Sequence, residues 1–165
     1  MSVITGIASG KFRVLCADTQ STYSDGHKEQ EPKIYRFATG LFGFAGDAKP
    51  EQELKAILRK QDTPEDVAHW PKGNYSCIFF SRTGACYSIG EEGALRWEKS
   101  ISFRSMGSGY QYATGAVFAA CKTLRWNIRR LPKRKLVYLA KLSVKSAIHY
   151  NESCGGRAQV KTLEL

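Results

Sequence analysis

The order of strand-like and helix-like segments constrains the fold of this chain more than any other feature of its sequence. Two blocks of apolar, strand-like runs are separated by one helical segment, and two helices and a final strand follow the second block. This order is typical of α+β folds, in which helices cover the outer faces of packed sheets. A chain of 165 residues is long enough to bury most of its apolar surface. We therefore expect a single α+β domain over residues 1–165.

The first block is predicted to contain four strands followed by a helix. Residues 2–7 and 12–17 are apolar runs joined by ASGK, which is typical of a hairpin turn. A polar loop is expected over residues 19–32, and the runs KIYRF and LFGFAG predict two further strands. Pro50 and the acidic residues after it, in EQELKAILRK, predict the start of a helix.

The second block predicts a hairpin and one more strand. Residues 74–80 and 85–89 form the hairpin across Arg82-Thr83-Gly84, and residues 95–103 are the further strand. A last strand is expected over residues 158–163, after the glycine pair that ends the second helix.

Two helices are predicted between these strands. The first begins at Gly109, because apolar residues recur at every fourth position, namely Tyr112, Ala116, Ala120, Leu124 and Ile128. Pro132 is expected to end or kink this helix. The second helix is expected over residues 136–150.

The cysteines and the chain start predict a reduced, cytoplasmic protein without a metal or cofactor. The five cysteines form an odd set with no CxxC spacing, which disfavours zinc sites and redox pairs: Cys16, Cys77, Cys86, Cys121 and Cys154. No run of about 18 apolar residues occurs, the length that a membrane-spanning helix needs. A secretory signal pattern is also not found at the first residues.

The excess of positive charge is concentrated in one segment. The formal net charge is +10, and residues 122–145 are rich in Lys and Arg with no Asp or Glu. Such a segment can neutralise phosphates and bind nucleic acid in a salt-dependent way. The alternative, which pattern alone favours, is the solvated face of two amphipathic helices. No zinc-finger or RNP motif accompanies the segment.

Six short motifs give the chain a resemblance to a known family. They are SVITGI, VLCADTQST, PKIYRF, GLFGFAGDA, SMGSGYQYATGA and YNESCGG, and they span nearly the whole chain. In this order and at this spacing they resemble proteasome β-type subunits, members of the N-terminal-nucleophile (Ntn) hydrolases, and their bacterial relatives. The resemblance implies a four-layer α-β-β-α sandwich. Residues 48–73 have room for little more than one of the two long helices that this family carries there.

The resemblance implies that Ser2 is the nucleophile. In this family the free N-terminal residue attacks a carbonyl through its side-chain oxygen, and its α-amine serves as the base. Removal of Met1 would give Ser2 both groups, and an α-amine with a pKa of about 7.7–8.0 suits this role near neutral pH. Considered by position alone, Ser2 is an ordinary second residue.

Asp18 and Lys33 match the family's charged pair. Asp18 follows the second predicted strand, where its carboxylate would orient a lysine; alternatively it caps the turn in ADTQST. Lys33 begins PKIYRF, and beside Ser2 its positive charge would stabilise an oxyanion and lower the pKa of the amine. A surface strand lysine is the alternative, and Lys28 is a second candidate in another register.

Four further residues complete the implied site. Gly43 matches the glycine whose N–H forms the oxyanion hole, although a bulge glycine would look the same. Ser108 matches a serine near the α-amine, or is a helix N-cap. Asn151 and Cys154 stand where the family commonly has Asp and Ser. Asn151 can form hydrogen bonds but brings no charge, and Cys154 is a poorer hydrogen-bond partner than serine.

The sequence therefore predicts a proteasome-like peptidase that cleaves unfolded polypeptide inside a homo-oligomeric ring. An ATP-dependent unfoldase is a further partner that the resemblance allows. The alternatives are a catalytically inactive scaffold with the same fold and, less favoured, a basic nucleic-acid-binding protein that uses residues 122–145.

Overall fold

The computed structural model describes residues 2–22 and 25–165, and the strands of these residues form three antiparallel sheets. A four-stranded sheet has the order β10-β1-β2-β11, a five-stranded sheet has the order β5-β6-β7-β8-β9, and β3 and β4 form a separate hairpin. The strands are β1 (Val3–Ser9), β2 (Phe12–Ala17), β3 (Gln20–Thr22), β4 (Lys28–Gln30), β5 (Ile34–Arg36), β6 (Gly40–Gly46), β7 (Tyr75–Ser81), β8 (Cys86–Gly90), β9 (Gly93–Arg96), β10 (Phe103–Gly107) and β11 (Gln159–Glu164).

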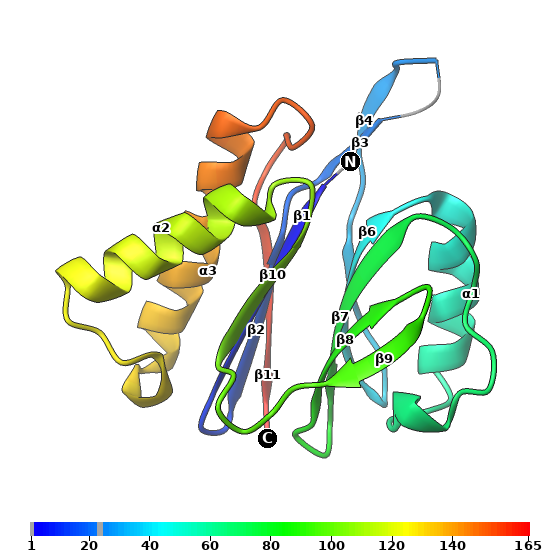
Figure 1. The fold of residues 1–165 in the computed structure, drawn as a ribbon, viewed down its shortest axis with the longest axis horizontal. Helices are drawn as coiled ribbons and strands as arrows, with labels where there is room; N and C mark the ends of the chain where they lie inside the picture. The colour runs from blue at the N-terminus through cyan, green and yellow to red at the C-terminus, as the bar shows by residue number, and fades with distance from the viewer. Residues whose placement is uncertain (1, 23–24) are drawn as a thin grey trace.

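Helices cover the outer faces of the two larger sheets (Figure 1). Helices α2 and α3 lie on the four-stranded sheet, α1 lies on the five-stranded sheet, and the two sheets face each other. The α-β-β-α sandwich predicted from the sequence is confirmed. The helices are α1 (Ala48–Leu58), α2 (Tyr110–Thr123) and α3 (Lys133–Tyr150), and the 3-10 turns are η1 (Pro64–Asp66) and η2 (Ile128–Arg130).

Strand β1 lies inside its sheet, which explains why a strand can begin so close to the chain start. It pairs with β10 on one side and with β2 on the other, so its backbone is held along both edges. Its side chains alternate between the layers, as the period of a strand requires. Val3 and Ile7 pack against the helices, whereas Ile4 packs between the sheets. Ser2 is therefore held firmly at the start of a buried strand.

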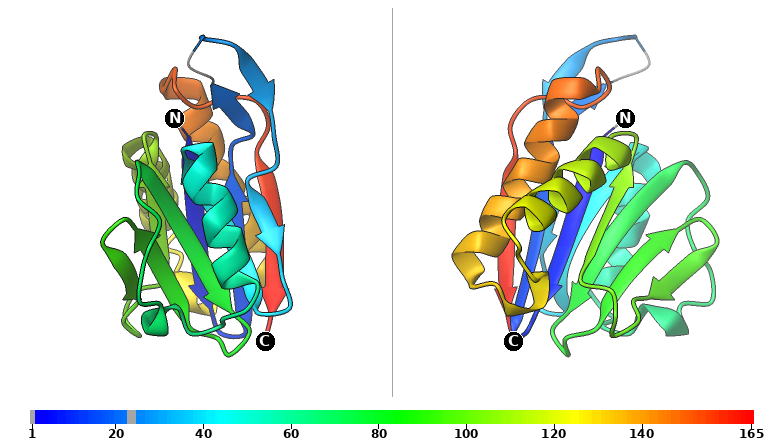
Figure 2. Two further views of the ribbon diagram at one scale, coloured as in Figure 1. Left: turned by 90° about the vertical axis from the view of Figure 1, so that its right-hand side faces the viewer. Right: turned by 60° about the vertical axis from the view of Figure 1, so that its left-hand side comes forward.

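The five-stranded sheet has an apolar layer on each face. Between the sheets, Ile4 and Leu15 pack against Ile78 and Phe80, and Phe80 contacts Trp97 edge to face at 5.4 Å between ring centroids. On the outer face, Leu54 and Leu58 of α1 lie on an aromatic cluster made of Phe42, Phe44, Tyr75, Phe79 and Tyr87. Figure 2 shows α1 in front of this sheet in its left view and α2 and α3 in front of the other sheet in its right view.

The segment between Ala48 and Gly73 contains one α-helix, as predicted from its length. After α1 only the short turn η1 follows before β7. Trp70 of this segment packs against the outer aromatic cluster, so an irregular chain occupies part of the outer face of the sheet. Within residues 2–22 and 25–165, no helix is both long enough and apolar enough to cross a membrane.

Two predicted elements are wrong. Residues 95–103 do not form one strand, because β9 ends at Arg96 and pairs with β8, whereas β10 begins at Phe103 and pairs with β1. Between them the chain passes from one sheet to the other, and Trp97 is buried in the layer that the sheets share. Likewise, the predicted loop at residues 19–32 contains the β3–β4 hairpin, which projects from the end of the sandwich (Figure 1).

The first long helix also differs from its prediction. It ends at Thr123, and Arg125 has a φ of 51°, a left-handed conformation that a helix interior does not allow. Pro132 precedes the first residue of α3 and serves as its N-cap position, so it begins the next helix. The buried residues of α2 are Ala113 and Val117; of the predicted apolar row, Tyr112 and Leu124 are exposed and the other three residues are half-buried.

Candidate active site

Ser2 is buried at the end of the sandwich where β1 begins, with 6% of its surface exposed. The Ser108 hydroxyl donates a hydrogen bond to the Ser2 carbonyl oxygen at 3.3 Å. Gly107 lies against the same carbonyl: a Cβ at Gly107 would lie 2.2 Å from the oxygen, and its φ is 92°. Only glycine fits there, so the turn between β10 and α2 fixes the backbone of Ser2.

Asp18 lies next to Ser2, directly after β2, and its side chain is fully buried. Its Oδ1 accepts a hydrogen bond from the backbone N–H of Val3 at 3.0 Å, and its Oδ2 accepts one from Gly155 at 3.1 Å. Its Oδ1 also lies 3.2 Å from the Nζ of Lys33. Asp18 therefore connects the start of β1 to the segment before β11 and to Lys33, and it does more than cap a turn.

Lys33 precedes β5 and is 6% exposed. Its Nζ donates hydrogen bonds to the Ser2 Oγ and to the carbonyl oxygen of Gln20. Its backbone N–H donates to the Oε1 of Gln159 at 2.9 Å, and the N–H of Ile34 donates to the same oxygen at 3.1 Å. The lysine is thus held at both its backbone and its ammonium group, with the ammonium on the hydroxyl of Ser2.

Burial changes the acidity of this pair. It lowers the pKa of Lys33, although the charge of Asp18 opposes the change. It raises the pKa of Asp18, although Lys33 and the two backbone N–H groups oppose this change. A lysine with a lowered pKa releases its proton more readily than a surface lysine, so its neutral amine is more available as a proton acceptor near neutral pH. Lys33 can therefore take part in proton transfer from the hydroxyl that it contacts.

Ser108, Asn151 and Cys154 form the side of the site that faces the helices. Ser108 directly precedes the N-cap residue Gly109 and makes no capping bond; its Oγ lies 3.8 Å from the Sγ of Cys154. The Nδ2 of Asn151 donates to the Ser108 carbonyl oxygen at 2.9 Å, and its Oδ1 accepts from the N–H of Ser153 at 2.9 Å. Asn151 therefore positions Ser108 without contributing charge.

The cysteines near the site are poor nucleophiles. Burial and the charge of Asp18 raise the pKa of Cys154. Burial raises the pKa of Cys16 to about 12, and its side chain is fully buried in the layer under the helices. Because the thiolate is the reactive form, both thiols are unreactive near neutral pH.

The structure does not bring Gly43 to the others. It lies in β6 between Ile34 and Ile78, and a Cβ on it would meet Leu15 in the layer between the sheets. Its part in an oxyanion hole stays a prediction. Lys28, the second lysine candidate, is exposed in β4, whereas Lys33 occupies the position beside Ser2.

A cavity of about 720 Å³ opens beside Ser2. Ser2, Lys33 and Ser108 line it, together with Tyr35, Ala45 and Glu51. The cavity has the size of a binding site for a small molecule or a few residues of peptide. A group of three or more His, Cys, Asp and Glu suited to a metal ion does not occur in the part of the chain that the structure describes.

Sequence motifs did not identify two residues that hold the site together. Gln159, in the last strand, fixes the backbone of Lys33 through its side chain. Gln20 supplies a carbonyl oxygen that accepts from Lys33 and, at 3.5 Å, from the Ser2 hydroxyl. Gln20 lies within the motif VLCADTQST without a predicted role, and Gln159 lies outside the six motifs. Both contacts depend on distant segments that fold together.

The sandwich and the buried serine at the start of its central strand define the fold of the proteasome-type Ntn hydrolases. No family model and no curated protein matches the chain. Solved structures do match. BPH from Thiobacillus denitrificans, solved in complex with epoxomicin, is 18% identical, with a TM-score of 0.72 over 99% of this chain and 98% of that one.

Two further structures show the same fold. HslV from Trypanosoma brucei is 17% identical with a TM-score of 0.73, and the match covers 99% of both chains. Anbu from Hyphomicrobium sp. strain MC1 is 17% identical with a TM-score of 0.73 over 98% of this chain and 82% of that one. The chain therefore has the proteasome β-subunit type of fold over nearly its full length.

Proposed function

We propose that this protein is a proteasome-like peptidase that hydrolyses peptide bonds with Ser2, after removal of Met1 exposes its amine. The observation that carries the proposal is the contact of the Lys33 ammonium with the Ser2 hydroxyl, supported by the buried carboxylate of Asp18. A hydroxyl, a buried cation and a cavity that meet at one point suit attack on a carbonyl. The fold shared with HslV and BPH supports the same activity.

The proposed reaction uses each group in turn. The Ser2 Oγ attacks the carbonyl carbon of the substrate, and its proton passes to the α-amine, with Lys33 in contact with the same hydroxyl. The charge of Lys33 favours the negative oxygen that develops. The C–N bond then breaks, the leaving amine takes the proton, and an ester remains on Ser2. Water hydrolyses this ester and restores the hydroxyl.

Serine at the nucleophile position, where this family usually has threonine, is also part of the proposal. Serine keeps the attacking oxygen but lacks the methyl group that restricts the χ1 rotamer. Here the contact with Lys33 and a long contact to the Gln20 carbonyl oxygen hold the Ser2 hydroxyl in place. These contacts replace part of the orientation that a methyl group would give.

Removal of Met1 is the first test of the proposal. Met1 lies outside the described residues, so its removal stays a prediction. Serine is a small second residue, and the protein isolated from its native host should begin at Ser2. Intact-mass measurement should show the mass of the chain without one methionine. A native protein that quantitatively retains Met1 would exclude the α-amine of Ser2 as the base.

A ring assembly is the second part of the proposal. Members of this fold family enclose their sites in chambers, and we propose a homo-oligomeric ring that acts on unfolded polypeptide in the cytoplasm, supplied by an ATP-dependent unfoldase. Light scattering after size exclusion should give a species several times larger than the 18.4 kDa chain. A stable monomer at micromolar concentration would contradict the chamber. Because the segment after α1 is short, we expect the subunits to form a ring, and we do not predict that two rings stack on each other.

Two alternatives have weaker support. Asn151 and Cys154 depart from the family pattern and favour an inactive scaffold, but both residues still make the contacts that hold Ser108. Nucleic-acid binding by residues 122–145 has less support, because several of their cations already have partners. Lys135 lies 4.7 Å from the ring centre of Trp126, and Arg129 donates to the carbonyl oxygen of Ser100 at 2.6 Å.

A further inference from the structure

The cavity beside Ser2 is lined by more acidic than basic residues. Of the described charged residues that line it, Lys33 and Lys55 are basic, and Glu31, Asp47 and Glu51 are acidic. The charge of Lys33 is already matched by Asp18 at 3.2 Å. The lining of the cavity therefore carries an excess of negative charge, although the whole chain has a net charge of +10.

Glu51 is held at the wall of the cavity by its neighbours on α1 and β5. Its Oε1 lies 2.8 Å from the Nζ of Lys55, one helical turn further along, and their side chains are 20% and 22% exposed. The same Nζ lies 3.7 Å from the ring centre of Tyr35. The Tyr35 hydroxyl donates to the carbonyl oxygen of Pro32, which fixes the ring. Tyr35 and Glu51 therefore form a rigid, partly buried wall with a carboxylate at its edge.

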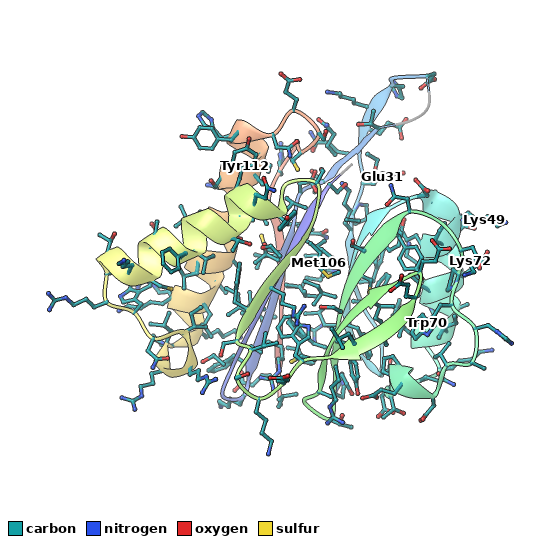
Figure 3. The ribbon with its side chains drawn as sticks, in the orientation of Figure 1. Glu31, Lys49, Trp70, Lys72, Met106 and Tyr112 are labelled. Atoms are coloured by element: carbon teal, nitrogen blue, oxygen red, sulfur yellow. The ribbon has the colours of Figure 1, made fainter. Side chains whose placement is uncertain are left out.

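Glu31 contributes a second carboxylate to the cavity. It precedes Lys33 by two residues and lines the cavity, and Figure 3 shows it at the end of the sandwich where the chain begins. Burial raises the pKa of Tyr35, and the charges of Glu51 and Glu31 both add to this effect. Two carboxylates, Glu31 from the segment before β5 and Glu51 from α1, thus line the cavity together with the ring of Tyr35.

We infer that this cavity takes a lysine or arginine side chain of the substrate, the one directly before the bond that Ser2 cleaves. The inference rests on the proposed peptidase function. The aliphatic stem would lie along the ring of Tyr35, and the cation would lie between Glu31 and Glu51. A substrate glutamate would meet two like charges, and a leucine would leave both carboxylates without a new partner.

Peptides that differ only in the residue before the cleaved bond test the inference. With arginine, leucine or glutamate there, kcat/KM should be about tenfold higher for arginine than for leucine and lowest for glutamate. Glu31→Gln and Glu51→Gln keep the side-chain shape and should each lower the arginine-to-leucine ratio about threefold or more. Lys55→Met removes the competing cation and should raise the ratio. Higher salt should lower it, because the site is open to solvent.

Glu53→Gln is the matched control, because Glu53 lies on the same helix, is exposed and does not line the cavity. It should leave the ratio unchanged. Equal cleavage of the arginine and leucine peptides, or a ratio that Glu51→Gln and Glu31→Gln do not change, would overturn the inference and leave the peptidase function intact. If wild type cleaves none of the peptides and no peptide epoxyketone modifies Ser2, the proposed function itself is overturned, and the inference with it.

Discussion

Replacing Ser2 by alanine should abolish peptide hydrolysis, with a loss of about a thousandfold or more in kcat/KM. The substitution removes the attacking oxygen and the acceptor of the Lys33 hydrogen bond, and it keeps a small second residue, which methionine removal requires. The contact of the Ser2 carbonyl oxygen with Ser108 and that of the Val3 N–H with Asp18 do not involve the side chain of Ser2, so both should remain. Fluorogenic peptide assays of wild type and Ser2→Ala measure the loss of hydrolysis, and size exclusion of both proteins measures whether the variant keeps the wild-type assembly.

An electrophile identifies the atom that reacts. A peptide epoxyketone or β-lactone should add to wild type at Ser2, as peptide mass spectrometry would show, and should not add to Ser2→Ala. Ser9→Ala is the control, since Ser9 is also buried in β1 but lies at the opposite end of the strand from the cavity. Wild-type turnover by Ser2→Ala would show that the nucleophile lies elsewhere. The raised thiol pKa values of Cys16 and Cys154 give no ready substitute.

Lys33→Ala and Asp18→Asn should each reduce hydrolysis by about a thousandfold, and the double variant should lose little more. The three side chains form one hydrogen-bonded unit, and the members of such a unit are not additive. Lys28→Ala provides a matched lysine control: the side chain is exposed in β4 and its loss should leave hydrolysis unchanged. Additive losses in the double variant would show that Asp18 and Lys33 act separately.

The same variants should differ in stability. Asp18→Asn leaves the buried ammonium of Lys33 without its carboxylate, which typically costs about 3–5 kcal/mol. Combining it with Lys33→Ala removes the unpaired cation and should restore part of the loss, as measured by urea unfolding. Activities should therefore be compared at a temperature at which circular dichroism shows each variant to be folded.

The arrangement of Ser2, Asp18 and Lys33 could be expected from the resemblance of the sequence motifs, and its physical basis in the structure is that each residue lies at the end of a strand. Ser2 precedes β1, Asp18 follows β2 and Lys33 precedes β5, so the topology of the sandwich brings these ends together. Gln159 could not be expected, since its contact with Lys33 joins positions 126 residues apart, and no local pattern marks it. Gly43 shows the opposite case, in which a motif matches while the structure places the residue away from the cavity.

The wrong element predictions have a common cause. The spacing of apolar residues in α2 predicted a buried row through Tyr112 and Leu124, but the neighbouring helix and sheet cover Ala113 and Val117 instead. Alanines contribute little to the hydrophobic periodicity from which a buried helix face is predicted, whereas aromatic residues contribute strongly to it even where they are exposed. Similarly, the apolar run at residues 95–103 does not show where the chain leaves one sheet for the other. Both errors concern which neighbours an element has, and the sequence encodes those only through the complete fold.

The positions of the two chain ends bear on how the protein should be made for such experiments. Ser2 lies beside the cavity, whereas Leu165 follows β11 at the opposite end of the sandwich (Figure 1), where its N–H donates to the Lys11 carbonyl oxygen at 2.9 Å. An affinity tag or fluorophore attached after Leu165 would extend away from the cavity. A fusion ahead of Ser2 would remove the free amine that the proposed mechanism needs. If a protease site is placed directly before Ser2, such a fusion should be inactive until the protease cleaves it, so that hydrolysis can be started at a chosen time.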